Sequence, residues 1–143
     1  MRFAIALLAV AVVSSPAAAQ RRATLRVEFD QSSPTSDAAF LTKAWTDSVN
    51  IFLNAELAQH GPTNLVRVDQ PRDFTNFRLF MQSIPLMAGA QSSGITAYSL
   101  ILFRSPNIGN SWQYITSEVG YTRSPRDAAT EMVRFVSSSL GAR

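Results

Sequence analysis

The chain has 143 residues, of which 46% are hydrophobic, with 13 basic and 10 acidic side chains and a formal net charge of +3. This length suits a single domain, and the dispersed basic residues argue against a nucleic-acid-binding protein, in which they would gather into a patch. The sequence contains no cysteine, which excludes disulfides, thiolate metal sites, cysteine nucleophiles and a lipid-modified amino-terminal cysteine.

The first residues have the pattern of a secretory signal peptide. Arg2 supplies a positive charge, Phe3–Val13 forms an apolar stretch, and Ala17–Ala19 meets the small-x-small cleavage rule. We therefore expect a signal peptide over 1–19 and a single exported domain over 20–143, located in the bacterial periplasm or secreted. An uncleaved anchor is the alternative, although the apolar stretch is shorter than the roughly 20 residues that span a bilayer.

The amino-terminal half of the domain predicts a strand, a helix and a strand. Apolar and polar residues alternate along Ala23–Phe29, which is typical of a half-buried strand. A long helix is expected over Asp37–Gln59, with apolar residues every fourth position and Ser36 placed to cap its amino end. The Gly-Pro pair after His60 ends this helix, and Asn64–Asp69 predicts a short second strand.

The segment Phe74–Ser83 fits two structures. A period of two fails because Phe80 and Met81 are adjacent, whereas a helical period places several of its large side chains on one face. We therefore expect a helix over Pro71–Ser83 that Pro85 ends or kinks. A strand is the alternative.

The last third of the sequence predicts a hairpin followed by a helix. The run Ile95–Arg104 is apolar on both faces, as in a central strand, and Trp112–Thr122 pairs with it after a turn-rich connection. Ser124 caps a helix that begins at Pro125 and ends at Gly141. The expected order is β-α-β-α-β-β-α, in an α/β (α+β) domain with a mixed sheet of four to five strands packed with helices.

The sequence offers few groups for catalysis. His60 is the only histidine and Lys43 the only lysine. A single histidine without cysteine argues against a zinc site, and no serine stands three residues before Lys43 to form a Ser-x-x-Lys nucleophile. We expect no enzyme activity, no catalytic residue, no metal site and no cofactor. The alternative is a small-ligand-binding or hydrolytic site with a pocket near Glu118 and Arg78. Glu118 lies in the middle of the last expected strand, whose opposite face is expected to carry core residues. Those expected core residues are Ile115, Val119 and Tyr121.

Surplus apolar surface is the more informative feature. If the helices cover one sheet face, a patch of large side chains remains on the other, and such a patch usually binds a partner. Its expected residues are Tyr98, Leu100, Leu102, Trp112 and Tyr114. A second contact is expected at an apolar segment that contains methionine, formed by Ile84, Leu86 and Met87. The alternative is that one helix crosses over and covers the patch.

These features predict an exported protein whose partner is an envelope protein or a second copy of the chain. Arg21 and Arg22 could contact an anionic surface, and a solvated leader before the first strand is the alternative. The sequence specifies neither the identity of the partner, nor the oligomeric state, nor the cellular process.

The organisation of the chain resembles a bacterial envelope module, the amino-terminal domain of the TolB translocation protein, and also CsgG-type secretion components. The segments that carry this resemblance are DAAFLTKAWTDSVNIFLNAELAQHG followed by NLVRVD, and GITAYSLILFR with WQYITSEVGYT followed by SPRDAATEMVRFVSSSLG. The resemblance implies a non-enzymatic module that docks with other envelope proteins.

Overall fold

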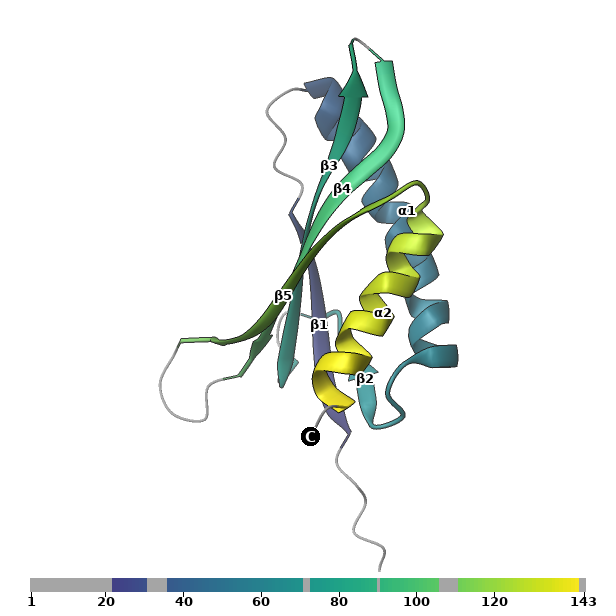
Figure 1. Ribbon diagram of the computed structural model, residues 1–143. Helices are drawn as coiled ribbons and strands as arrows, with labels where there is room; N and C mark the ends of the chain where they lie inside the picture. Colours follow the sequence, from purple (N-terminus) through teal and green to yellow (C-terminus); the bar gives the residue numbers. More distant parts are fainter. Residues whose placement is uncertain (1–21, 31–35, 71–72, 90, 106–110, 142–143) are drawn as a thin grey trace, which may run out of the picture.

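A computed structural model describes residues 22–30, 36–70, 73–89, 91–105 and 111–141, with side chains in the first helix from Thr42 onward. The expected signal peptide over 1–19, its cleavage position and Arg21 lie outside this part of the chain. The elements shown in Figure 1 are β1 (Ala23–Asp30), α1 (Ser36–His60), β2 (Leu65–Arg67), β3 (Phe77–Ala88), β4 (Gln91–Arg104), β5 (Gln113–Thr122) and α2 (Pro125–Gly141).

The strands form one mixed sheet in the order β2-β1-β3-β4-β5. β1 pairs in parallel with β2 and β3, whereas β3, β4 and β5 form an antiparallel meander. Both helices lie on the same side of the sheet (Figure 1). The predicted fold class, a mixed sheet of four to five strands packed with helices, is therefore confirmed. Neither of the two helices that the structure describes lies over the other sheet face (Figure 1).

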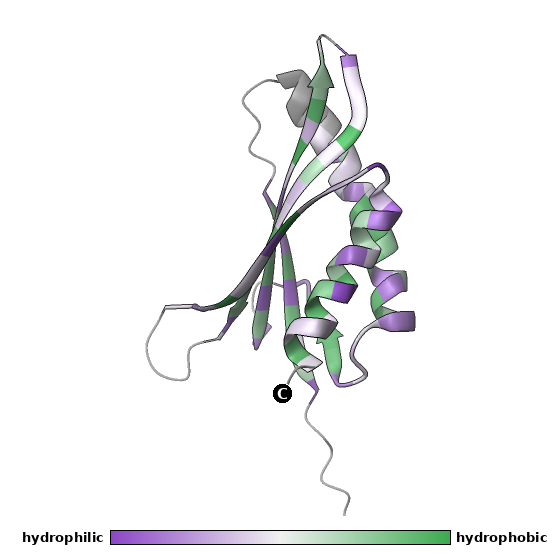
Figure 2. Ribbon diagram, viewed as in Figure 1, coloured by the Kyte–Doolittle hydropathy of each residue, from purple (hydrophilic) through white to green (hydrophobic). Residues whose placement is uncertain are grey.

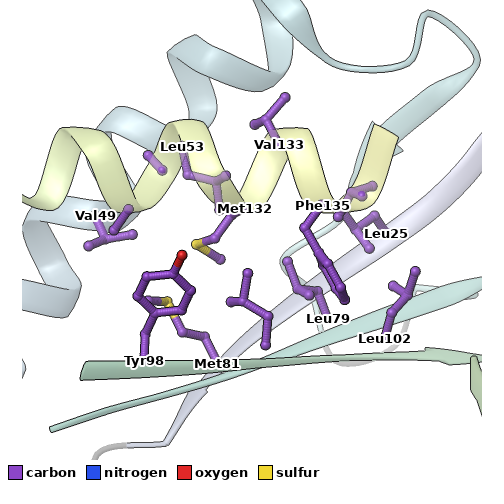
Figure 3. Packing of buried hydrophobic residues seen from close by; sticks show 14 residues of the cluster. Leu25, Val49, Leu53, Leu79, Met81, Tyr98, Leu102, Met132, Val133 and Phe135 are labelled. Atoms are coloured by element: carbon purple, nitrogen blue, oxygen red, sulfur yellow. The ribbon is translucent and has the colours of Figure 1, made fainter. Parts of the chain in front are cut away.

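The hydrophobic core lies between the sheet and the two helices (Figure 3). Each strand contributes alternate residues to it, since successive side chains of a strand point to opposite faces. Hydrophobic and hydrophilic residues alternate along β1, and both kinds recur along α2 (Figure 2). The core residues that are at most 1% exposed include Leu25, Val49, Leu53, Leu79, Met81, Leu100, Leu102, Met132 and Val136.

The helix expected over 71–83 is wrong, and the strand alternative is correct. The segment from Phe77 onward forms β3, which lies between β1 and β4 in the middle of the sheet. Leu79 and Met81 face the helices while Phe80 faces the opposite way, so a strand with apolar residues on both faces shows no simple alternation. Pro85 lies at an irregularity in the β3–β4 pairing, where a strand tolerates proline.

For the two predicted helices that form, three of the four expected end signals are confirmed. The backbone N–H of Asp127 donates to the Ser124 hydroxyl at 3.0 Å, which is the expected cap of α2. At the end of α1, the N–H of Gly61 donates to the carbonyl of Leu57 at 3.0 Å, and α2 ends at Gly141. The capping role predicted for Ser36 concerns a side chain outside the described set. No helix among the described residues is long and apolar enough to cross a membrane.

Gly120 provides a first test of the packing between β5 and β4. It pairs with Tyr98, and a Cβ atom added at Gly120 would lie 2.6 Å from the Tyr98 hydroxyl oxygen and 2.7 Å from the ring. Gly120→Ala should therefore push the tyrosine ring out of its packed position and lower the free energy of unfolding in urea by about 1–3 kcal/mol.

Gly141→Ala is the matched control, because a Cβ atom added there meets nothing within 4 Å. Its free energy of unfolding should stay within about 0.5 kcal/mol of the wild type. Equal unfolding free energies for Gly120→Ala and the wild type would contradict the close packing of Tyr98 on β5.

Candidate functional site

The face of the sheet without helices, called here the open face, is built from alternate residues of four strands. The strand registers place them in cross-strand rows, so that Glu28, Phe80, Ile101 and Ser117 are successive neighbours. The open face comprises Arg26, Glu28, Asp30, Arg78, Phe80, Gln82, Ile84, Ala97, Ser99, Ile101, Phe103, Tyr114, Ser117, Val119 and Tyr121.

The half of the open face over β1 and β3 is polar and internally paired. The guanidinium of Arg78 lies 2.7 Å from the Glu28 carboxylate and stacks over the Trp112 ring, 5.5 Å from its centroid. The side-chain amide of Gln82 donates to the Asp30 carboxylate at 3.3 Å. Because both signs of charge are present and paired, this half creates no strong field of one sign.

The half over β4 and β5 is apolar and exposed. Val119 is 77% exposed, Tyr121 74% and Tyr114 61%, and Ile84 on β3 is 56% exposed. The hydroxyl of Tyr114 lies within hydrogen-bonding distance of a neighbouring serine hydroxyl on β5 at 3.0 Å, which holds that ring along the strand. These four residues are called here the apolar patch.

Small residues beneath the apolar patch leave it hollow. Val119 is opposite Ser99 and Tyr121 is opposite Ala97 in the β4–β5 pairing, so each large side chain of β5 stands beside a short one of β4. A depression of about 210 Å³ results, with Ile84 on its other side. A hollow apolar surface of this kind accepts an apolar side chain from another molecule.

The tip of the β3–β4 hairpin extends the apolar surface. Leu86 is 36% and Met87 51% exposed, and the turn that follows contains Gly89 with φ of 67°. The sequence prediction placed both side chains, with Ile84, in an apolar contact segment. The structure confirms that all three are exposed, whereas their role in binding stays a prediction.

The patch predicted from the sequence is only partly formed. Tyr98 is 7% exposed and Leu100 and Leu102 are fully buried beneath the helices, so placing these three on the uncovered face was wrong. Of the two remaining residues, Tyr114 is exposed on the open face and Trp112 is half-buried against a guanidinium group. Both faces of β4 are apolar, and periodicity alone could not tell which face the helices cover.

A bulge explains why β5 was misread. The pairing of β4 with β5 shifts between Leu102 and Phe103, so that Leu102 pairs with Thr116 and Phe103 with Tyr114. Ile115 is the extra residue, and it packs against the core as predicted. A bulge reverses the faces on either side of it, and consequently Val119 and Tyr121, two further residues predicted as core, lie on the open face. The sequence around Ile115 contains no proline or glycine that would indicate a bulge.

The alternative site near Glu118 and Arg78 is not formed. Glu118 pairs with Leu100 across the sheet and therefore faces the helices, where Arg134 of α2 forms an ion pair with it. Arg78 lies on the open face, so the two side chains point away from each other across the sheet. His60, 65% exposed, lies 3.9 Å from the Glu56 carboxylate. Within the described part of the chain, no group of three histidine, cysteine or acidic side chains could hold a metal ion.

The position of Tyr98 under α2 predicts an alkaline loss of stability. Burial raises the pKa of its hydroxyl above the usual value of about 10, and the nearby carboxylates of Glu131 and Glu118 raise this pKa further, against a lowering effect of Arg134. In the unfolded chain the hydroxyl loses its proton first, so the free energy of unfolding should fall as the pH rises above about 10.

Alkaline titration of tyrosinate absorbance tests this prediction. The tyrosinate absorbance of the wild type should contain a component that appears at the highest pH. This component should be absent from Tyr98→Phe. The free energy of unfolding of Tyr98→Phe should also decline less steeply above pH 10 than that of the wild type. Identical titration curves for the two proteins would show that Tyr98 is not held in a buried environment.

Comparison with known proteins identifies the fold and no family. No protein-family model matches the sequence, and no curated protein matches it. The crystal structure of protein XCC0632 from Xanthomonas campestris, described with the family model DUF330, is similar with a TM-score of 0.55 and 13% sequence identity over 90% of this chain and 91% of that chain.

Two further solved structures match at lower similarity. The hypothetical protein CT253 from Chlamydia trachomatis has a TM-score of 0.43 and 8% identity over 83% of this chain and 95% of that one. The PelC dodecamer from Paraburkholderia phytofirmans has a TM-score of 0.42 and 18% identity over 90% and 93%. None of these proteins is described as a TolB domain or a CsgG-type component, so the resemblance to those families stays a prediction.

Proposed function

We propose that this protein is an exported, non-enzymatic assembly module of the bacterial cell envelope, which works by burying its open face against another protein chain. The exposure of the apolar patch is the observation that carries this proposal. Soluble monomers rarely expose contiguous apolar patches larger than a few hundred Å², and such patches usually bind a partner. The signal-like pattern of residues 1–19 supports export.

The occupant of the open face that its chemistry fits is a second copy of the chain. A symmetric dimer brings the same surface together twice, so that surface must be complementary to itself. The charged half carries two basic and two acidic residues, namely Arg26, Arg78, Glu28 and Asp30. Because neither sign of charge is in excess on that half, a copy rotated by a two-fold axis would meet no net repulsion there, and it would bring apolar side chains to the hollow beside Val119.

Contact with an anionic surface is a separate, weaker part of the proposal. Arg22 is exposed at the start of β1, at the end of the sheet opposite the β3–β4 hairpin tip (Figure 1). A basic side chain near an anionic membrane contributes about 1 kcal/mol, so one or two arginines would orient the molecule without anchoring it.

Sedimentation velocity of the mature protein over a wide concentration range tests the proposal. We expect the weight-average sedimentation coefficient to rise with concentration toward that of a dimer or larger closed assembly. A monomer at every concentration would contradict self-association. If the protein is a monomer but binds a different envelope protein, and if changing Val119 abolishes that binding, the assembly role holds with another partner.

A further inference from the structure

A second cavity lies on the helix-covered side of the sheet, away from the open face. It has a volume of about 180 Å³ and is enclosed by the first half of α1, the hairpin of β3 and β4, and the residue that follows β5. The polar side chains around it come from Thr42, Trp45, Ser83, Ser92, Thr96 and Arg123.

The polar side chains of the described residues that line this cavity are basic or carry hydrogen-bond donors. Its lining offers the hydroxyl groups of Ser83, Ser92 and Thr96 together with a guanidinium group, and none of the described residues that line it is acidic. Arg123 is exposed and forms no ion pair with any carboxylate of the described residues. A guanidinium together with several hydroxyl donors is the combination that binds oxyanions, because each hydrogen bond to a charged oxygen is strengthened.

Ser83 supplies an independent reason to expect a ligand. Its side chain is only 5% exposed, and its hydroxyl has no hydrogen-bond partner within the described part of the structure. A buried hydroxyl without a partner costs about 1–3 kcal/mol, so natural proteins keep such groups where a water or a ligand completes the bond. Ser83 borders the cavity, and an oxygen atom bound there would accept its proton.

We propose that this cavity binds a small oxyanion, such as inorganic phosphate or a short carboxylate. Arg123 provides the charge, the Ser83 and Thr96 hydroxyls provide directed hydrogen bonds, and the Trp45 ring provides an apolar wall. The volume equals that of about six liquid water molecules, which is enough for a ligand of this size class. This site is separate from the open face, and binding there does not depend on assembly.

Fluorescence of Trp45 reports on the cavity directly. The chain has two tryptophans, and the other one, Trp112, stacks on the open face. In a Trp112→Phe background we would titrate sodium phosphate and, separately, sodium acetate, with sodium chloride at matched ionic strength as the blank. The expected result is a saturable change in Trp45 emission with at least one of the two anions.

Variants of the lining residues decide whether the anion occupies this cavity. Arg123→Gln should weaken binding at least tenfold, and Ser83→Ala by a factor of about three to ten, as expected for losing a charged and a neutral hydrogen bond. Arg104→Gln, which removes an arginine at the end of β4 far from the cavity, should leave binding unchanged. A saturating anion should also raise the Tm of the wild type, and it should not raise that of Arg123→Gln.

Two results would overturn the proposal. One is the absence of any saturable fluorescence change with either anion, which would mean that only water completes the bond of Ser83. The other is an equal affinity in Arg123→Gln and the parent protein, which would place the anion elsewhere. Arg123→Lys keeps the positive charge and is the control for a folding defect. Its affinity for the anion should lie between that of the parent protein and that of Arg123→Gln.

Discussion

Leu100→Ala is expected to lower the free energy of unfolding by about 3–4 kcal/mol, whereas Ile101→Ala should lower it by about 1 kcal/mol. The two residues are adjacent on β4 and differ in the face they occupy. Leu100 is fully buried beneath the helices, so its truncation removes apolar contacts and leaves a cavity that the surrounding core cannot close. Ile101 faces away from the helices and is only partly buried.

Urea denaturation at low protein concentration measures both values, because dilution removes any contribution from association at the open face. Leu100 is one of the residues that the sequence placed in a binding patch, so this pair of variants separates that assignment from the core assignment. Equal losses at the two positions, or a larger loss at Ile101, would contradict the two-layer arrangement with one covered sheet face.

Val119→Glu is expected to weaken self-association at least a hundredfold while leaving the fold unchanged. The side chain is 77% exposed in the monomer, so a carboxylate there remains hydrated and costs little stability. In an assembly that buries the apolar patch, the same carboxylate would lose its water without gaining a partner, which costs several kcal/mol. Tyr121→Glu, in the adjacent cross-strand row, should act in the same way.

Ile51→Glu is the matched control for this experiment. Ile51 is also a large apolar residue, 71% exposed, but it belongs to α1 and so lies on the other side of the sheet from the open face. Sedimentation of the three variants should show monomers for Val119→Glu and Tyr121→Glu and wild-type assemblies for Ile51→Glu. Dissociation by Ile51→Glu alone would instead locate the interface on the helices.

The local signals in the sequence predicted most of the elements correctly. The alternation in β1, the four-residue apolar repeat in α1 and the Ser124-Pro125 start of α2 each depend on residues close together in the chain, and each is confirmed. These signals are strong because caps, turns and periodicities are local physical effects. The fold class followed from their order.

Features that depend on tertiary partners could not be predicted in the same way. β3 was expected to be a helix because the apolar Phe80, on its open face, is adjacent to the core residue Met81 and interrupts the alternation. The covered face of β4 was ambiguous for the same reason, since its odd-numbered residues such as Ile101 and its even-numbered residues such as Leu100 are both apolar. Only the packing of the helices distinguishes them.

The candidate site was mispredicted through one backbone irregularity. The bulge at Ile115 exchanges the faces of β5, so the sequence grouped Tyr114 with Glu118 and assigned Val119 to the core. One extra residue in a strand reverses every side chain beyond it. Leu86 and Met87 are exposed near the hairpin tip, and their role in a contact stays a prediction.

Cysteine accessibility at position 119 is the most direct test of the proposed role of the open face. The chain has no natural cysteine, so a Val119→Cys variant carries a single thiol on the apolar patch, and Ile51→Cys carries one on α1. We would compare maleimide labelling of the two variants in the intact cell envelope with labelling of the diluted, purified proteins. Strong protection of Val119→Cys in the envelope, with Ile51→Cys labelled equally in both states, is the predicted result. Equal labelling of Val119→Cys in both states would contradict burial of the open face against a protein partner.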